Sequence, residues 1–182
     1  MDIVKRAGQG PCRVSPHSTG CCRSLDRGRR SLGHVAHISG QIHIDAPPEL
    51  VFDTVADSRN EPSFNPDMRE VELLTPLPIG AGPRFSARTG KGGSEMLVEI
   101  IDFDRPQRLL TRTTSSMMAT SGTLTFSPSR GGTLMTWNWQ VQPKGWLRAL
   151  GPMFGPIGNR VERGIWTGLK RHLEDAAPTS PG

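Results

Sequence analysis

The stretch HISGQIHIDAPPELVFDTVAD, residues 37–57, decides the fold, because it changes from a two-residue period to a helical one within a short segment. Over residues 37–46 isoleucines alternate with polar side chains, which predicts a strand with one buried face. Two prolines then open a predicted helix over residues 47–57, and Asp45 is expected to cap its first turn. Residues 60–68, with two further prolines, predict a short second helix or turn.

Beyond this point the period returns to two and predicts six more strands, joined by turns so short that neighbours must be antiparallel. The end of the chain is helical instead, because apolar residues recur at steps of three and four from Leu147 to Leu173. Pro152 and Pro156 are expected to kink or interrupt the first half of this helix. The six predicted strands are residues 69–75, 84–89, 95–103, 108–115, 120–127 and 133–141.

This order of elements predicts an α+β fold in which a curved seven-stranded antiparallel sheet wraps around the long C-terminal helix, the helix-grip arrangement. The chain also resembles the SRPBCC superfamily, the START-like group of polyketide cyclases/dehydrases and lipid-transfer proteins, in particular its small actinobacterial members. The resemblance implies the helix-grip fold but no single reaction, since the superfamily includes both ligand carriers and cyclases. It covers about residues 37–175 and rests on HIDAPPELVFDTVAD, NEPSFNPDM, PIGAGPRF, SGTLTF with GGTLMTWNW, and IWTGLKRHLED.

The positive charge is confined to the N-terminal segment. The chain has 22 basic and 17 acidic residues, of which residues 1–36 hold seven and two, so the remainder is balanced. A domain without excess positive charge lacks the electrostatic basis for binding nucleic acid. No apolar run is long enough to cross a membrane, and no secretory signal core is present, so a cytoplasmic location is expected.

Residues 1–36 are predicted to be a disordered basic tail, residues 37–175 the START-like domain, and residues 176–182 a disordered C-terminal tail. A metal site formed by Cys21, Cys22 and nearby histidines is disfavoured, because adjacent cysteines do not match zinc-ligand spacing. Two interpretations of the N-terminal tail remain open: a targeting arm rich in Arg and Ser, or a misassigned start preceding Val35. We favour the misassigned start.

A curved sheet that grips one helix leaves a space between them, and the inward side chains decide whether it is solid core or a ligand pocket. Strand alternation predicts a mainly apolar inner surface to which two threonines of residues 108–115 add hydroxyls. Any single one of these side chains is more often plain core than a ligand contact. The candidate ligand-binding residues are Met96, Val98, Ile100, Thr111, Thr113, Met117, Phe126, Met135, Trp137, Trp139, Phe154, Ile157 and Val161.

Candidates for catalysis are few. No histidine falls on an inward face, and Asp102 and Asp104 are expected to lie in a solvated turn rather than to share a proton. Glu162 and Arg163 are expected on the exposed face of the C-terminal helix. No cofactor or metal motif is recognised, so no cofactor is expected.

Three functions therefore remain. The first is binding of a hydrophobic or aromatic small molecule between the sheet and the C-terminal helix. The second is a polyketide cyclase or dehydratase, in which a shaped cavity and a few hydroxyls fold a reactive chain. The third is an interaction module with a filled interior and no ligand. Whether the protein is an enzyme, and its oligomeric state, stay open at this point.

Overall fold

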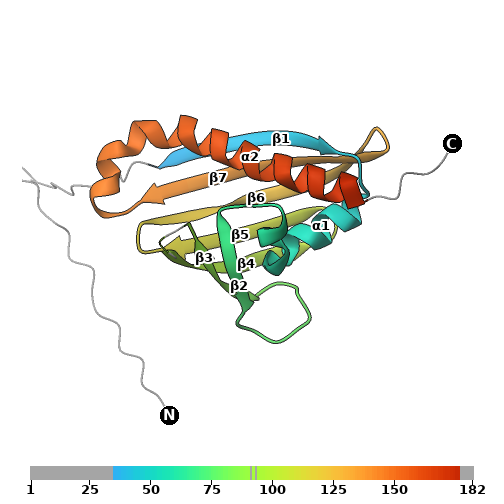
Figure 1. The fold of residues 1–182 in the computed structure, drawn as a ribbon, viewed down its shortest axis with the longest axis horizontal. Helices are drawn as coiled ribbons and strands as arrows, with labels where there is room; N and C mark the ends of the chain where they lie inside the picture. The colour runs from blue at the N-terminus through green and yellow to red at the C-terminus, as the bar shows by residue number, and fades with distance from the viewer. Residues whose placement is uncertain (1–34, 91, 93, 177–182) are drawn as a thin grey trace, which may run out of the picture. The chain divides into compact units, whose positions relative to one another are not determined.

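The computed structural model describes residues 35–90, 92 and 94–176, so the interpretations made for residues 1–34 and 177–182 lie outside the described residues. One antiparallel sheet holds seven strands in the order β1-β7-β6-β5-β4-β3-β2 (Figure 1). This confirms the predicted seven-stranded sheet. The strands are β1 (Ala36–Ile44), β2 (Met68–Leu73), β3 (Arg84–Thr89), β4 (Ser94–Asp104), β5 (Arg108–Ser115), β6 (Met118–Ser129) and β7 (Gly132–Pro143).

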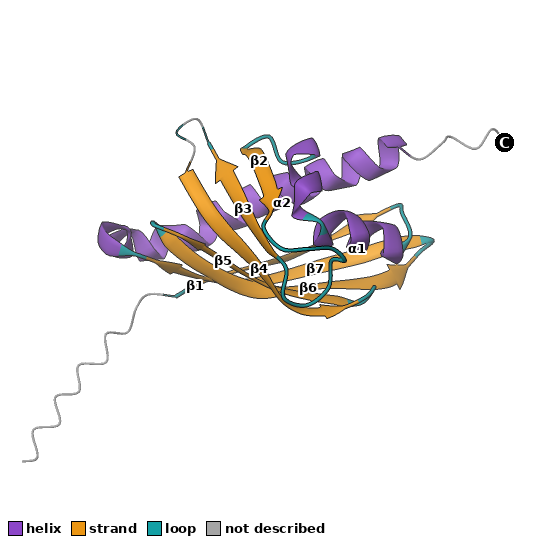
Figure 2. Ribbon diagram, turned by 90° about the horizontal axis from the view of Figure 1, so that it is seen from below, coloured by secondary structure: helices purple, strands orange, loops and turns teal. Residues whose placement is uncertain are grey.

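The helices lie on one side of the sheet, which curves beneath them (Figure 2). They are α1 (Pro48–Ala56), the 3-10 helices η1 (Ser58–Ser63) and η2 (Gly145–Leu150), and α2 (Gly151–Ala176). This arrangement is the predicted helix grip. Of the two expected effects of the prolines, an interruption at Pro156 is wrong, because α2 continues through this residue. A proline this close to the helix start removes one backbone hydrogen bond without ending the helix. Among the described residues, no helix is both long enough and apolar enough to cross a membrane.

Alternation along β7 places its large apolar side chains inside, as predicted. Met135, Trp137, Trp139 and Val141 are all buried, whereas the intervening Asn138 and Gln140 are exposed. Burial of such side chains against a helix is the main favourable contribution to folding. The first part of the core therefore lies between this face of the sheet and α2.

A second part of the core lies under α1. Phe52 is fully buried and makes edge contacts with Phe103 at 5.0 Å and with Phe126 at 5.3 Å between ring centroids. Edge-to-face aromatic pairs of this kind are favourable beyond the area they bury. α1 thus closes one end of the space above the sheet.

The expected capping role of Asp45 is wrong. Pro47 occupies the N-cap of α1 and makes no side-chain cap. Asp45 instead lies directly after β1, and its Oδ1 is 3.1 Å from His43 Nδ1. Its backbone N–H donates to Glu174 Oε1 at 2.8 Å. A proline at the first helical position has no N–H to satisfy, so the missing cap costs less than elsewhere.

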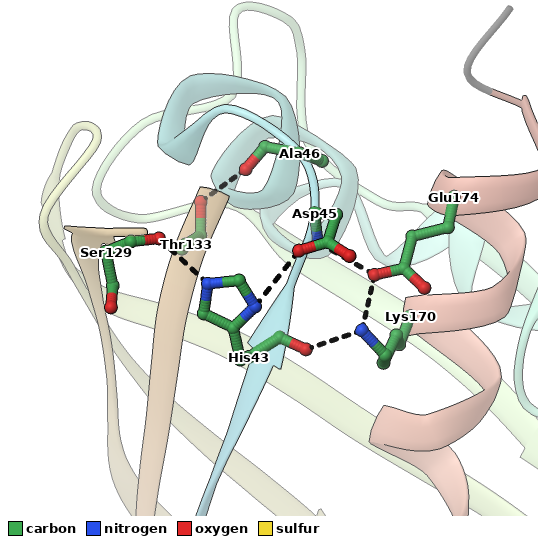
Figure 3. Close-up of polar contacts among 7 residues, drawn as sticks. All are labelled: His43, Asp45, Ala46, Ser129, Thr133, Lys170 and Glu174. Atoms are coloured by element: carbon green, nitrogen blue, oxygen red, sulfur yellow. Dashed lines mark hydrogen bonds and ion pairs between the residues drawn. The ribbon is translucent and has the colours of Figure 1, made fainter. Parts of the chain in front are cut away.

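Polar side chains of α2 fasten it to the free edge of β1 (Figure 3). Lys170 Nζ donates to the His43 carbonyl at 2.9 Å and pairs with Glu174. Nearer the start of the helix, Asn159 Oδ1 accepts from the Ser39 N–H at 3.1 Å. Desolvation raises the pKa of Glu174, but the hydrogen bonds from Lys170 and from the Asp45 N–H, together with the positive charge of Lys170, hold this pKa below its usual value. The helix is therefore anchored to β1 at two points, at Asn159 and at Lys170.

Two glycines let α2 approach its neighbours closely. A Cβ at Gly158 would lie 2.1 Å from the Ile38 side chain on β1, and a Cβ at Gly168 would lie 2.1 Å from the Phe64 carbonyl oxygen, directly after η1. At Gly164, one turn before Gly168, nothing lies within 4 Å. The contact at Gly168 sets the distance between α2 and η1.

Candidate ligand pocket

A cavity of about 430 Å³ lies between the sheet and the helices α2 and η1. Strands β4 and β5 form one wall, and the exposed side chains of Met117 and Val161 lie at its rim, so the cavity opens to solvent. Its size falls within the range of pockets that take small molecules. The lining consists of Val55, Ser58, Glu61, Asn65, Asp67, Met68, Thr89, Ser94, Met96, Val98, Leu109, Thr111, Thr113, Ser115, Met117, Met118, Thr120, Leu124, Trp139, Val161, Glu162, Ile165 and Trp166.

Seven of the thirteen candidate residues from the sequence line this cavity. They come from β4, β5, the turn after β5, β7 and α2: Met96, Val98, Thr111, Thr113, Met117, Trp139 and Val161. The other six are not part of the lining: Ile100, Phe126, Met135, Trp137, Phe154 and Ile157.

The six residues outside the lining have two distinct fates. Four of them are buried core, including Phe126 against Phe52 and Trp137 against Trp166, whose ring centroid lies 6.2 Å away. The other two belong to the first half of α2, where Ile157 is 55% exposed. The inward face of a strand is longer than the cavity it borders, so alternation alone does not separate pocket from core.

Hydroxyl groups add polarity to the β5 wall without adding charge. Thr111 and Thr113 line the cavity, and the intervening Arg112 is exposed, as the predicted register requires. The Ser115 hydroxyl is already engaged, because it accepts from the N–H groups of Met117 and Met118 in the turn before β6. The two threonines are therefore the hydroxyls of this strand that face the cavity with capacity to orient a ligand.

Glu162 is the functional candidate that the sequence reasoning missed. Instead of lying on the exposed face of α2, it lines the cavity, and its Oε2 accepts a hydrogen bond of 3.0 Å from Trp139 Nε1. The buried face of α2 is centred on Trp166, Leu169 and Leu173, and Glu162 lies one turn before Trp166 on this face. The sequence prediction assigned Val161, one position earlier, to the buried face of α2. It missed Glu162 because an acid at an inward position interrupts the apolar pattern that marks this face. The one signal in the sequence was Trp166, four residues after Glu162, because residues four apart lie on the same face of a helix.

Burial raises the pKa of Glu162 to about 7. The hydrogen bond that Trp139 Nε1 donates to Glu162 opposes this shift, and the negative charge of Glu61 adds to it. Trp166 lines the same cavity, and its buried Nε1 has no hydrogen-bond partner. At neutral pH this carboxyl group can therefore both donate and accept a proton.

Glu61 of η1 is a second carboxyl group in the cavity. Its Oε1 accepts from Nδ2 of the buried Asn65 at 2.8 Å, and burial raises its pKa although this hydrogen bond opposes the shift. With Asp67, the described lining contains three carboxylic acids and no Lys, Arg or His. The cavity is thus uncharged along the sheet and acidic beside η1 and α2.

A wider hollow of about 580 Å³ lies on the outer side of α2, and its lining includes Arg160, Arg163 and Arg171. All of its lining residues belong to α2, so it is a surface groove along one helix and cannot enclose a ligand. Arg163 is exposed there, as the sequence predicted. The arginines of α2 therefore lie on the side of the helix away from the cavity.

The remaining acid candidates lie at the surface. Asp102 pairs with Arg108 at 2.6 Å, and Asp104 is exposed. Both belong to the end of β4, so these acids lie in the strand and not in the turn that follows it. Both ring nitrogens of His43 are occupied at the β1 end, by Asp45 and by the Ser129 carbonyl (Figure 3). Neither group belongs to the cavity lining.

Comparison with known proteins places this geometry in context. The profile of the family described as "Polyketide cyclase / dehydrase and lipid transport" matches residues 35–174. Among solved structures, the Zhui aromatase/cyclase from Streptomyces sp. R1128 is similar with a TM-score of 0.68 and 15% identity, covering 82% of this chain and 99% of that chain. A START superfamily protein from Mycobacterium smegmatis gives a TM-score of 0.67 at 14% identity, covering 78% and 99%. A protein from Thermus thermophilus gives 0.61 at 18% identity, with the same coverage. No curated protein matches the chain.

Proposed function

The chain belongs to the polyketide cyclase/dehydrase and lipid transport family, and from this membership and the cavity geometry we propose that it binds a hydrophobic or aromatic small molecule. The ligand lies between the sheet and α2, with its apolar body along Met96 and Val98 of β4 and its polar end toward Glu162. The observation that carries the proposal is the cavity of about 430 Å³ with its largely apolar lining.

Two features of the cavity favour a bound ligand over a structural void. It opens to the surface past Met117, an unbranched thioether side chain that adapts to varied shapes. It also carries convergent polar groups, the threonines of β5 and the carboxyl groups, whereas voids that merely reflect imperfect packing are apolar. The hypothesis of a ligand-free interaction module is less well supported, because it predicts a filled interior.

Saturable binding of Nile red, a neutral apolar dye, tests the proposal on the full chain, together with native mass spectrometry for a co-purifying molecule. The matched variants are Trp139→Phe, which changes the cavity lining, and Trp137→Phe, two residues away in the core. We expect the first to weaken dye binding and the second to leave it within about twofold. Equal effects of the two variants, or no saturable binding and no co-purifying molecule, would contradict the proposal.

A cyclase or dehydratase is the second candidate, and the observation that favours it is a carboxyl group with a pKa of about 7 inside the cavity. As a carboxylate, Glu162 can remove a proton from a methylene group between two carbonyls of a poly-β-keto chain. The resulting enolate carbon attacks a second carbonyl carbon of the same chain, and the alkoxide oxygen takes the proton back. Subsequent loss of water needs no oxidant or reductant. Each step uses a proton that one carboxyl group can carry.

Turnover of a poly-β-keto thioester tests this second function. Glu162→Gln removes the proton carrier with little change in volume, and Thr111→Val removes a hydroxyl that would orient the chain. For a cyclase we expect the first variant to lower kcat by about a hundredfold or more and the second to act mainly on KM. Binding without turnover by the unaltered protein would exclude this function and leave the binding function standing.

A further inference from the structure

Two carboxyl groups from different elements reach the same cavity without a basic partner. Glu61 comes from η1 and Glu162 from α2, and they are close enough for the charge of one to affect the ionisation of the other. The described lining holds no Lys, Arg or His, and the arginines of α2 line the groove on its outer side. A positive charge that would balance these acids is therefore not supplied by the cavity walls.

Indole rings stand beside the same carboxyl groups. Trp139 and Trp166 both line the cavity, and Trp139 donates its N–H to Glu162, which fixes the orientation of this carboxylate. Aromatic rings next to carboxylates form the environment in which proteins bind organic ammonium groups, because the ring quadrupole and the negative charge both attract a cation. Below these groups the walls are apolar and carry threonine hydroxyls.

The negative charge of the cavity predicts different affinities for anionic, neutral and cationic amphiphilic ligands. A carboxylate or phosphate would enter a space with three acids and no base, and like charges at short range in a desolvated site repel strongly. A neutral ligand gains the apolar contacts but leaves both acids without a counter-charge. A protonated amine gains the apolar contacts and also relieves the cost of burying the two carboxylates.

We propose that the ligand is an organic amine, bound as its ammonium ion between Glu61 and Glu162 beside the two indoles, with its apolar part along β4 and β5. This inference rests on the proposed binding function and names the chemical class of its ligand. Glu162, held by Trp139, fixes the position of the ammonium group, and Glu61, held by Asn65, completes the charge balance.

The test compares three ligands of one shape and different charge on the full chain: 1-naphthylmethylamine, 1-naphthylmethanol and 1-naphthoate. Affinities are measured by isothermal titration calorimetry at about pH 8, where the amine is protonated. We expect the amine to bind at least about tenfold more tightly than the alcohol, and the alcohol more tightly than the naphthoate. Glu162→Gln should bring the amine to within about threefold of the alcohol. The control, Glu72→Gln on the exposed side of β2, removes one charge outside the cavity and should leave the order unchanged.

Equal affinity of the amine and the alcohol for the unaltered protein overturns the inference, as does tightest binding of the naphthoate. This comparison needs no variant, so it decides the matter even if Glu162→Gln fails to fold. Binding of Nile red without any of the three naphthyl ligands overturns the amine inference and leaves the binding function intact. Absence of binding by all four, together with the absence of a co-purifying molecule, contradicts the binding function as well.

Discussion

The close approach of α2 to η1 yields a prediction in which one helix supplies both the perturbation and its control. Replacing glycine by alanine in a helix interior adds about 0.5–1 kcal/mol of stability, because the unfolded chain loses conformational freedom. At Gly164, where nothing lies within 4 Å, Gly164→Ala should show this gain in full.

At Gly168 the same substitution meets backbone. The new Cβ would lie 2.1 Å from the Phe64 carbonyl oxygen, far inside van der Waals contact, so η1 and α2 must separate by on the order of 1 Å. Overpacking of this kind costs about 1–3 kcal/mol, which exceeds the helical gain. Gly168→Ala should therefore destabilise the protein by about 0.5–2 kcal/mol, opposite in sign to Gly164→Ala.

Urea unfolding followed by circular dichroism measures both changes, with the free energy of unfolding compared at a common m-value. Because η1 carries Glu61, the displaced helix should also weaken Nile red binding in Gly168→Ala, while Gly164→Ala should leave it unchanged. Equal free energies of unfolding for the two variants would refute the reasoning that Gly168 is a packing contact.

Two further predictions concern α2. Leu169 is fully buried, so Leu169→Asp should cost several kcal/mol in thermal unfolding; near-native stability would mean that this face of α2 does not pack on the sheet. Glu162 has a folded-state pKa of about 7 against 4.5 for the free group, so the folded state holds its proton more tightly than the unfolded chain. Its contribution to stability is then fully present below about pH 4.5 and is lost as the pH rises through about 7, by on the order of 3 kcal/mol. Glu162→Gln should remove this loss, and parallel pH profiles of unfolding for the two proteins would contradict it.

Particular residues show how far sequence reasoning reaches in this fold. The bounds of β3 and β5 agree with the prediction residue for residue, because glycine, proline and serine turns mark both ends of each strand. Burial of Met135, Trp137, Trp139 and Val141 follows from alternation alone. For these strands, the alternation of apolar and polar residues in the sequence is therefore enough to predict which side chains are buried.

The cavity itself was less predictable. Trp137 and Trp139 share one strand face, yet Trp139 reaches the cavity and Trp137 packs on Trp166, because only the path of α2 decides which inward residues it covers. Glu162 was not predicted for a different reason. It is a charged residue on an inward face, and an argument from periodicity assigns charged residues to the solvent-exposed face. Rules that place charged residues at the surface therefore fail at Glu162, the residue on which the proposed cyclase reaction and the proposed binding of an amine depend most.

The fastening of α2 along β1 also bears on how the protein behaves at high concentration. An open sheet has two free edges, and an unpaired edge strand invites pairing with another chain, the first step of many aggregation reactions. Side chains of α2 already occupy the Ser39 N–H and the His43 carbonyl of β1, and the N–H of Asp45 directly after it. A strand from a second molecule would have to displace the helix before it could add there. Loss of Lys170 and Asn159 together should therefore promote self-association through β1 before it unfolds the domain.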